Sequence, residues 1–485
     1  MKEIINLFRQ KGYLLAPELL QMKSSQLQEL YSHVHANHFK IKILNMSIYN
    51  DFTNKKMETI NNDFPNTHVE ILKSFEDEDS KKKVNTFVEF YNDRFEKISS
   101  FLKNRPELSN VNSAKNISEE NNTSKISMIG MVSNISLTKN NNMIITLEDP
   151  TGNVKIMITE KNSDLYKKSQ DIVLDEVIGI TGSKARGFIF ANEIFFPDMP
   201  TNFEFKKSSD EVYAAFISDI HIGSTAFMEE SFTKFIDWVK GSAGSPEQRE
   251  TSKKLGYLFI IGDVVDGIGI YPSQENDLVI KDIYEQFNVF TKFIKQIPEH
   301  VQIIICPGNH DGTRIAEPQP PYPKIFLKEL YEMKNVTMVS NPAYLKIHEV
   351  EGSLGFIVLM YHGYSLDHYC LDVQSLRNAG GYGAVEKVVE FLLKKRHLAP
   401  THGSSLFVPS SEDKMIIEIV PDIVATGHIH NLRTSVLNHI NVITCSCFER
   451  TTGETYAERL GHKPTPAIVP IINLKTRKVS VMDFN

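Results

Sequence analysis

The sequence predicts an α/β domain in its C-terminal half, preceded by a small β-barrel and a helical N-terminal region. Three observations lead to this prediction. From residue 211 onward, short apolar segments that end in polar residues alternate with helical segments. Residues 125–203 hold five short segments of alternating polarity, and the first 75 residues carry apolar side chains at helical spacing.

The bulk composition fits a globular protein of more than one domain. A chain of 485 residues predicts two or three domains. Its 41% hydrophobic and 23% charged residues are ordinary for such proteins. The formal net charge of -7 argues against a protein held on nucleic acid by clustered Lys and Arg. If DNA is the substrate, metal ions or a partner must supply much of the attraction.

The four cysteines indicate a reducing compartment. They are Cys306, Cys370, Cys445 and Cys447, and they form no CxxC pair, so neither a disulfide framework nor a thiolate zinc site is expected. A buried apolar position is expected for at least one of Cys445 and Cys447. The N-terminus lacks the apolar core of a signal peptide, and no stretch reaches the roughly 18 apolar residues of a membrane span. We therefore expect a soluble cytoplasmic protein without membrane contact.

The first 124 residues divide into a small helical domain, 1–75, and a connecting region, 76–124. Ile4, Ile5 and Phe8 predict a helix that stops at Gly12. Within the connecting region, VNTFVEFYNDRFEKISSFL predicts a second helix. The following stretch, SNVNSAKNISEENNTSK, is almost free of large apolar residues and predicts a flexible linker.

Residues 125–203 predict an OB-type barrel. Five short strands with turn residues between them, such as Asp149-Pro150-Thr151-Gly152, are typical of this architecture. Such barrels often bind single-stranded nucleic acid, and many serve as docking surfaces. Few aromatic side chains are available for base stacking here, which favours docking over contact with DNA.

Residues 211–485 predict the α/β domain. Its strands are the short apolar runs VYAAFISD, LGYLFIIGD, VQIIICPGN, GFIVLMYHG, DIVATGH and NVITCSC. Polar groups at the ends of such strands are where active sites of α/β domains lie. Residues 241–254 predict an exposed insertion, and the C-terminal PTPAIVPIINLKTRKVSVMDF predicts a closing strand pair.

The strand ends carry one consistent set of metal-ligand types. They are Asp219 and His221 in SDIHIG, Asp263 in GDVVDG, Asn309 and His310 in PGNHD, His362 in YHG, and His428 and His430 in TGHIH. Carboxylate, imidazole and amide oxygen together suit hard or borderline divalent metals. Any one motif alone is more often structural than functional. Five of them in order, each following an apolar strand, indicate a two-metal centre for phosphoester chemistry.

This series resembles the calcineurin-like metallophosphoesterase family over residues 211 to about 450. The resemblance implies two packed sheets flanked by helices. It also implies one metal held by Asp219, His221, Asp263 and His430, and a second held by Asp263, Asn309, His362 and His428. His310 then corresponds to the catalytic histidine beside the metals, a residue type well suited to proton transfer near neutral pH.

A closer resemblance covers nearly the whole chain. GDVVDGIGIYP, AEPQPP, KKRHLAPTHG and GHKPTPAIVPIINLKT are similar to segments of the small subunits of archaeal family-D DNA polymerases. This resemblance implies metal-dependent 3′→5′ exonuclease activity on a DNA 3′ end, used for proofreading beside a large polymerising subunit. It favours manganese, although magnesium, iron and zinc suit the same ligands. Contact with a sliding clamp through the complex stays open.

Two alternatives remain from the sequence. The chain could be a non-enzymatic scaffold for the polymerising subunit, which its acidic charge and barrel favour, or a free-standing phosphodiesterase. Beside the site, Asp266 and Asp311 are candidates for orienting its histidines, and simple turn or capping roles suit them equally. The run Lys394–Arg396 could contact phosphate or a partner, or form a solvated helix end. His397 and His462 have no ligand spacing, which favours ordinary surface or core positions.

Overall fold

The computed structural model describes residues 2–36, 43–44, 46, 49, 64–76, 83–119, 125–350 and 353–485. The chain divides into two compact units, Met1–Pro65 and Asn66–Asn485. Among the described residues, no helix is long and apolar enough to cross a membrane.

The first unit is a small helical domain. It contains α1 (Lys2–Gln10), a 3₁₀ turn (Pro17–Gln21) and α2 (Ser24–Ala36), with the two-residue strands β1 (Leu14–Leu15) and β2 (Ile43–Leu44) paired in parallel. The helix predicted from Ile4 and Phe8 is confirmed, and the chain turns at Gly12 with φ of 85°. Phe8 and Leu27 lie in its buried core.

The second unit contains two mixed six-stranded sheets. The first has the order β12-β11-β10-β9-β18-β19 and the second the order β16-β17-β15-β14-β13-β3. In the first sheet, β9 (Tyr213–Ile217), β10 (Leu255–Ile261), β11 (Gln302–Cys306) and β12 (Val336–Met338) are parallel, while β18 (Ile468–Asn473) and β19 (Val479–Asp483) close it in antiparallel pairing. The predicted C-terminal strand pair is therefore confirmed.

The second sheet combines three parallel strands with antiparallel edges. Its parallel strands are β14 (Ser353–Tyr361), β15 (Ile423–Thr426) and β17 (Ile440–Thr444). The edges are β16 (Arg433–Leu437) on one side, and β13 (Ala343–Val350) with β3 (Val69–Lys73) on the other. All six strands predicted from apolar runs between residues 211 and 447 are present.

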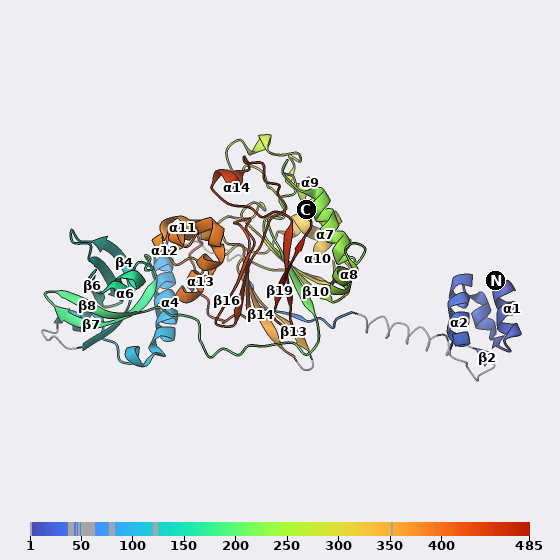
Figure 1. Ribbon diagram of the computed structural model, residues 1–485, viewed down its shortest axis with the longest axis horizontal. Helices are drawn as coiled ribbons and strands as arrows, with labels where there is room; N and C mark the ends of the chain where they lie inside the picture. The colour runs from blue at the N-terminus through green and yellow to red at the C-terminus, as the bar shows by residue number, and fades with distance from the viewer. Residues whose placement is uncertain are drawn as a thin grey trace. The chain divides into compact units, whose positions relative to one another are not determined.

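The two sheets pack face to face and are covered by helices on their outer sides. Side chains alternate along β9, so Ala214 and Phe216 face the second sheet while Ala215 and Ile217 face helices. The outer helices of the first sheet are α7 (Glu229–Val239), α9 (Ile283–Ile294) and α10 (Lys324–Tyr331), as Figure 1 shows. Those of the second are α11 (Leu366–Asp372), α12 (Gln374–Asn378) and α13 (Val385–Lys395). Burial on both faces explains why these strands read as continuous apolar runs.

The predicted barrel is a closed sheet of five strands in the order β4-β5-β6-β8-β7. Its strands are β4 (Lys125–Leu137), β5 (Met143–Asp149), β6 (Gly152–Ile158), β7 (Val177–Ala185) and β8 (Phe188–Phe195), with α6 (Ser163–Ser169) between β6 and β7. The predicted helix α4 (Val84–Lys103) packs on the barrel through Ile98 and Leu102.

Three segments differ from the sequence predictions. The region 1–75, predicted as helical, includes strand β3, because the edge of β13 offers backbone hydrogen bonds that the sequence pattern does not show. The predicted linker 109–125 contains helix α5 (Ala114–Glu119), since Ile117 is buried in the barrel core and Asp149 accepts a hydrogen bond from the Ala114 amide. The predicted insertion 241–254 contains α8 (Pro246–Lys253), which starts with a Ser245–Gln248 capping box.

A buried polar cluster joins α4, the barrel and the α/β domain. The Arg94 guanidinium donates to Asp413 at 2.6 Å, to the Pro400 carbonyl and to the Asp175 carbonyl in the barrel. His397 contacts the same Asp413 oxygen at 2.8 Å. Burial raises the pKa of Asp413, but Arg94 and His397 together outweigh this effect and hold that pKa well below its usual range.

The basic run that precedes His397 is also largely internal. Lys395 is buried and pairs with Glu176 of the barrel at 2.8 Å. Arg396 is buried and donates to the Ile417 and Glu418 carbonyls. Neither a solvated helix end nor a phosphate contact describes these two side chains, because tertiary packing encloses them.

We predict that Asp413→Asn destabilises the protein by about 3–5 kcal/mol, because it leaves the buried Arg94 charge without its counter-ion. Urea unfolding followed by circular dichroism measures this loss. Glu412→Gln is the matched control, since Glu412 lies beside Asp413 with its side chain 67% exposed. A loss below about 1 kcal/mol for Asp413→Asn would contradict this account of the cluster.

A second prediction concerns Glu317, which is fully buried and accepts a hydrogen bond from Tyr361 at 3.1 Å. Burial raises its pKa from 4.5 to about 7. Between these values the folded protein keeps a proton that the unfolded chain has lost, so stability falls as pH rises through this window. The free energy of unfolding of Glu317→Gln, relative to that of the parent, should therefore rise by up to about 3 kcal/mol as the pH increases from 5 to 8. Unfolding measured at pH 5 and at pH 8 should show Glu317→Gln to be more stable than the parent at pH 8 only. The exposed Glu299→Gln is the control.

Candidate metal centre

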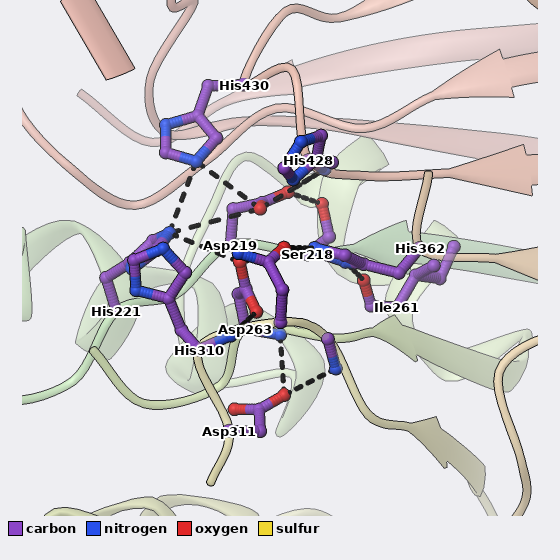
Figure 2. A network of polar contacts seen from close by, with 12 residues as sticks. Ser218, Asp219, His221, Ile261, Asp263, His310, Asp311, His362, His428 and His430 are labelled. Atoms are coloured by element: carbon purple, nitrogen blue, oxygen red, sulfur yellow. Dashed lines mark hydrogen bonds and ion pairs between the residues drawn. The ribbon is translucent and has the colours of Figure 1, made fainter. Parts of the chain in front are cut away.

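The side chains predicted from the motifs meet at one edge of the two sheets. Asp219 and His221 follow β9, Asp263 follows β10, and Asn309 and His310 follow β11. His362 follows β14, while His428 and His430 follow β15. Neighbouring parallel strands end at the same edge, and both sheets present this edge to one site, as Figure 2 shows. All eight of these side chains are buried.

The loops that carry these residues adopt a left-handed backbone conformation. Asp219, His221, Asp263, His428 and His430 have φ angles of 52°, 54°, 50°, 70° and 58°. A non-glycine residue held there costs on the order of 1–3 kcal/mol, and such strain clusters at functional sites. The sharp reversal lets residues i and i+2 both face the site: Asp219 and His221 of DxH meet in one cluster, while His428 and His430 of HxH enter different clusters.

Glycines beside the functional residues allow the loops to approach closely. A Cβ atom at Gly308 would lie 2.2 Å from Asp263 Oδ1, and one at Gly262 would lie 2.5 Å from His362 Nδ1. At Gly427 it would lie 2.8 Å from Asp219 Oδ2. These contacts are too short for any side chain, which explains the glycine in the GD, GNH and GH motifs.

The first cluster contains Asp219, His221 and His430. Asp266 Oδ1 lies 3.1 Å from His221 Nδ1, and because a carboxylate only accepts, Nδ1 carries the hydrogen. His221 Nε2 faces His430 Nε2 at 3.2 Å, and that His430 atom lies 3.3 Å from Asp219 Oδ1. A single proton on His430 could satisfy only one of these contacts.

The second cluster contains Asp263, Asn309, His362 and His428. His362 Nδ1 donates to the Ile261 carbonyl at 2.8 Å, which leaves Nε2 facing the cluster, with a proton or a metal ion as its partner. This Nε2 atom lies 3.2 Å from Asp263 Oδ2 and 3.0 Å from Asn309 Oδ1. Asp263 Oδ2 also lies 4.0 Å from His221 Nε2, which places this carboxylate between the two clusters.

The donor atoms of both clusters fit divalent metal ions. Asp219, His221 and His430 each offer one ligand atom within 4.8 Å of the others, and so do Asp263, His362 and His428. Carboxylate oxygens and imidazole nitrogens converge in each cluster, and a metal cation could take the place of the protons between them. The His and Asp groups could therefore hold metal ions.

The charge state of the site suits this purpose. Burial alone would raise the carboxyl pKa values, but the nearby His430 lowers the pKa of Asp219 to about 2. His362 and His310 likewise hold the pKa of Asp263 well below its usual range. In turn, Asp263 overcomes the effect of burial and raises the pKa of His362 to about 10. The two carboxylates are thus ionised at neutral pH.

The two acidic neighbours predicted beside the site have different contacts. Asp266 contacts His221, and its backbone carbonyl accepts from His310 Nδ1 at 2.9 Å. Asp311 bonds no histidine; its carboxylate accepts from the amides of Asp263, Val265 and Gly308 and from the Tyr322 hydroxyl. Asp266 therefore orients histidines, whereas Asp311 fixes the loops.

Two residues of the site were missed from the sequence. Asp367 at the start of α11 lies 2.9 Å from His428 Nε2 and 2.9 Å from His462 Nε2. Asp367 thus fixes the His428 tautomer with Nδ1 free for a ligand bond. His462, predicted as an ordinary surface or core residue, is buried beside both histidines of the HxH motif. No spacing rule connects Asp367 and His462, because α11 and the C-terminal loop meet only in the fold.

A pocket of about 420 Å³ opens over the two clusters. His221, Asp263, Asn309, His310, His428 and His430 line its inner part. The buried ligand types are therefore accessible to a substrate.

Comparisons with known proteins agree on one family. Residues 214–434 match the family of DNA polymerase alpha/epsilon B subunits. The DNA polymerase II small subunit of Methanothermobacter thermautotrophicus is 36% identical over 397 residues, which cover 82% of this chain and 79% of that protein. The protein of the same name from Methanocaldococcus jannaschii is 36% identical over 413 residues, covering 83% and 67%.

Among solved structures, an archaeal phosphodiesterase aligns with 56% of this chain and 99% of its own length. Its sequence identity of 13% and TM-score of 0.25 are too low to establish a shared fold or function.

We predict that Asp367→Asn weakens binding of manganese by roughly 10- to 100-fold, because His428 loses the carboxylate that orients it. Isothermal titration calorimetry on chelator-treated protein measures the two dissociation constants. Asp372→Asn on the same helix is the control, since Asp372 is 64% exposed and pairs with His368, away from the two clusters. Equal affinities in Asp367→Asn and the parent protein would exclude this role.

Proposed function

The chain belongs to the family of archaeal DNA polymerase II small subunits, and we propose that it carries the 3′→5′ exonuclease activity of that polymerase. A small subunit of this family implies a large catalytic subunit as its partner. The proposed substrate is a DNA 3′ end, and the proposed role is proofreading beside that partner.

The convergence of five loops at one edge is the observation that carries this proposal. Seven ligand-type side chains lie in two clusters with Asp263 between them. A scaffold subunit without activity would have no use for strained loops and ionised, crowded carboxylates at this edge. We propose Asp219, His221, Asp263 and His430 as ligands of one metal, and Asp263, Asn309, His362 and His428 as ligands of the other.

The proposed chemistry is hydrolysis of the terminal phosphodiester. Divalent ions, for which we favour manganese, supply Lewis-acid activation of water and phosphate when bound. His310 is the proposed proton donor to the leaving 3′-oxygen. Its Nδ1 bonds the Asp266 carbonyl, which leaves Nε2 for proton exchange with the substrate. The fixed Asp266 loop keeps that ring in place.

We propose that the five-stranded barrel is of the OB type and that it docks to the large subunit. The strand order β4-β5-β6-β8-β7 with a helix before β7 supports the OB assignment. The net charge of -7 supports delivery of DNA by the partner, because the chain alone lacks the excess of positive charge that attracts phosphate.

We predict that Asp263→Asn lowers exonuclease activity by at least roughly 100-fold, because the negative charge shared by both clusters is lost. The amide oxygen can still accept from the His310 amide, as Asp263 Oδ1 does at 2.8 Å, so the loop should stay folded. Time-resolved digestion of a 3′-mismatched primer, with manganese and with chelator, measures the rate and its polarity.

Asp237→Asn on the outer helix α7 is the control, and its activity should equal that of the parent. Association with the large subunit should survive in both variants. An unmodified complex that leaves the primer intact in manganese would refute the exonuclease and leave only the scaffold role.

A further inference from the structure

The pocket over the metal centre has a second wall that the proposed chemistry does not use. Besides the acidic and histidine side chains, the pocket is lined by Ile270, Tyr271, Tyr456 and Leu460 with Arg459. One part of the pocket therefore suits a phosphate and metal ions, and the adjoining part suits a flat apolar group.

Two stacked tyrosines form the centre of this wall. The rings of Tyr271 and Tyr456 are 4.1 Å apart and 2° from parallel. Tyr271 is buried, its ring lies 6.4 Å from that of His310, and its hydroxyl donates to Asp277 at 3.1 Å. The pair is thus anchored next to the proposed catalytic histidine.

Tyr456 is held by the start of a short helix. It is the first residue of α14 (Tyr456–Arg459), whose N-terminus has a Thr455–Glu458 capping box. Glu458 also accepts from the amides of Thr452 and Gly453, which fixes the preceding turn. A half-buried ring on a fixed backbone loses little entropy when a ligand stacks on it.

Arg459 lies beside the stack. Its guanidinium carbon is 5.9 Å from the Tyr271 ring centre and 5.8 Å from that of Tyr456. These nearly equal distances place it level with the gap between the rings, so it does not cover the outer face of Tyr456. Asp277 lies 3.4 Å from Arg459 and keeps it there.

We propose that Tyr456, supported by Tyr271 and flanked by Arg459, is a stacking platform for the nucleobase of the terminal nucleotide. This inference rests on the proposed function, since it names how that site holds its substrate. An aromatic face stacks on any base, so the platform accepts DNA ends without sequence preference. A frayed, mismatched end presents an unstacked base, so the platform would favour such an end over a fully paired one.

The test compares two single-stranded oligonucleotides that differ only in the last nucleotide, which is either thymidine or an abasic tetrahydrofuran residue. For the parent protein with manganese, kcat/KM for removal of the thymidine should exceed that for the abasic residue by about 5- to 150-fold. Tyr456→Ala should bring this ratio close to one. Tyr456→Phe should restore it, because stacking needs the ring and not the hydroxyl.

Tyr284→Ala is the control, since Tyr284 is an exposed tyrosine on α9 outside the pocket lining. It should leave the ratio and both rates unchanged. The proposal is overturned if Tyr456→Ala lowers both rates equally, which would indicate a role in the fold, or if it leaves the ratio as in the parent.

Binding of the isolated product separates this inference from the exonuclease itself. The parent should bind thymidine 5′-monophosphate at least about 5-fold more tightly than 2-deoxyribose 5-phosphate, and Tyr456→Ala should remove the difference. If the parent degrades no DNA but shows this difference, the exonuclease proposal fails and the platform stands. Equal affinity of the parent for both compounds refutes the platform whatever the nuclease assay gives.

Discussion

The crowding of electron-rich atoms at one sheet edge is the constraint on which the rest of this structure depends. Asp219, His221, Asp263, His362 and His430 bring carboxylate oxygens and imidazole nitrogens within 3.2–4.0 Å of one another. Such an arrangement is unfavourable unless protons or metal cations are shared within it and a rigid frame holds it. Two buried sheets provide that frame, because their parallel strands end together and cannot move apart without opening the core between them.

The loops at this sheet edge are shaped to hold the crowded groups close together. Glycines let neighbouring backbones approach to distances that no Cβ atom would allow, and the ligand-type residues take the left-handed conformations. Asp311 then ties three loop amides to one carboxylate. Burial and the nearby Asp263 raise the pKa of Asp311 to about 6, so the carboxylate that accepts these hydrogen bonds is still mostly ionised at pH 7.

The attachment of the barrel follows the same principle of buried, paired charge. Arg94, Lys395 and their carboxylate partners are enclosed between α4, the barrel and the α/β domain. A buried ion pair of this kind adds little net stability, but removal of one partner strongly destabilises the protein. The pairs therefore favour one arrangement of α4, the barrel and the α/β domain. The barrel is therefore held to the α/β domain by specific contacts.

The sequence by itself predicted six buried strands, the C-terminal strand pair, the five strands of the barrel and the eight polar side chains that meet at one sheet edge, because buried strands and metal-ligand motifs are local patterns. The capping box of α8 is also a local pattern, and it could have been recognised in the sequence. Only the tertiary structure decided that β3 joins the second sheet, that α5 folds against the barrel, and that Lys395 is internal. It also decided that Asp367, His462 and Tyr456 belong to the site, since these residues reach it from segments whose meeting depends on long-range packing.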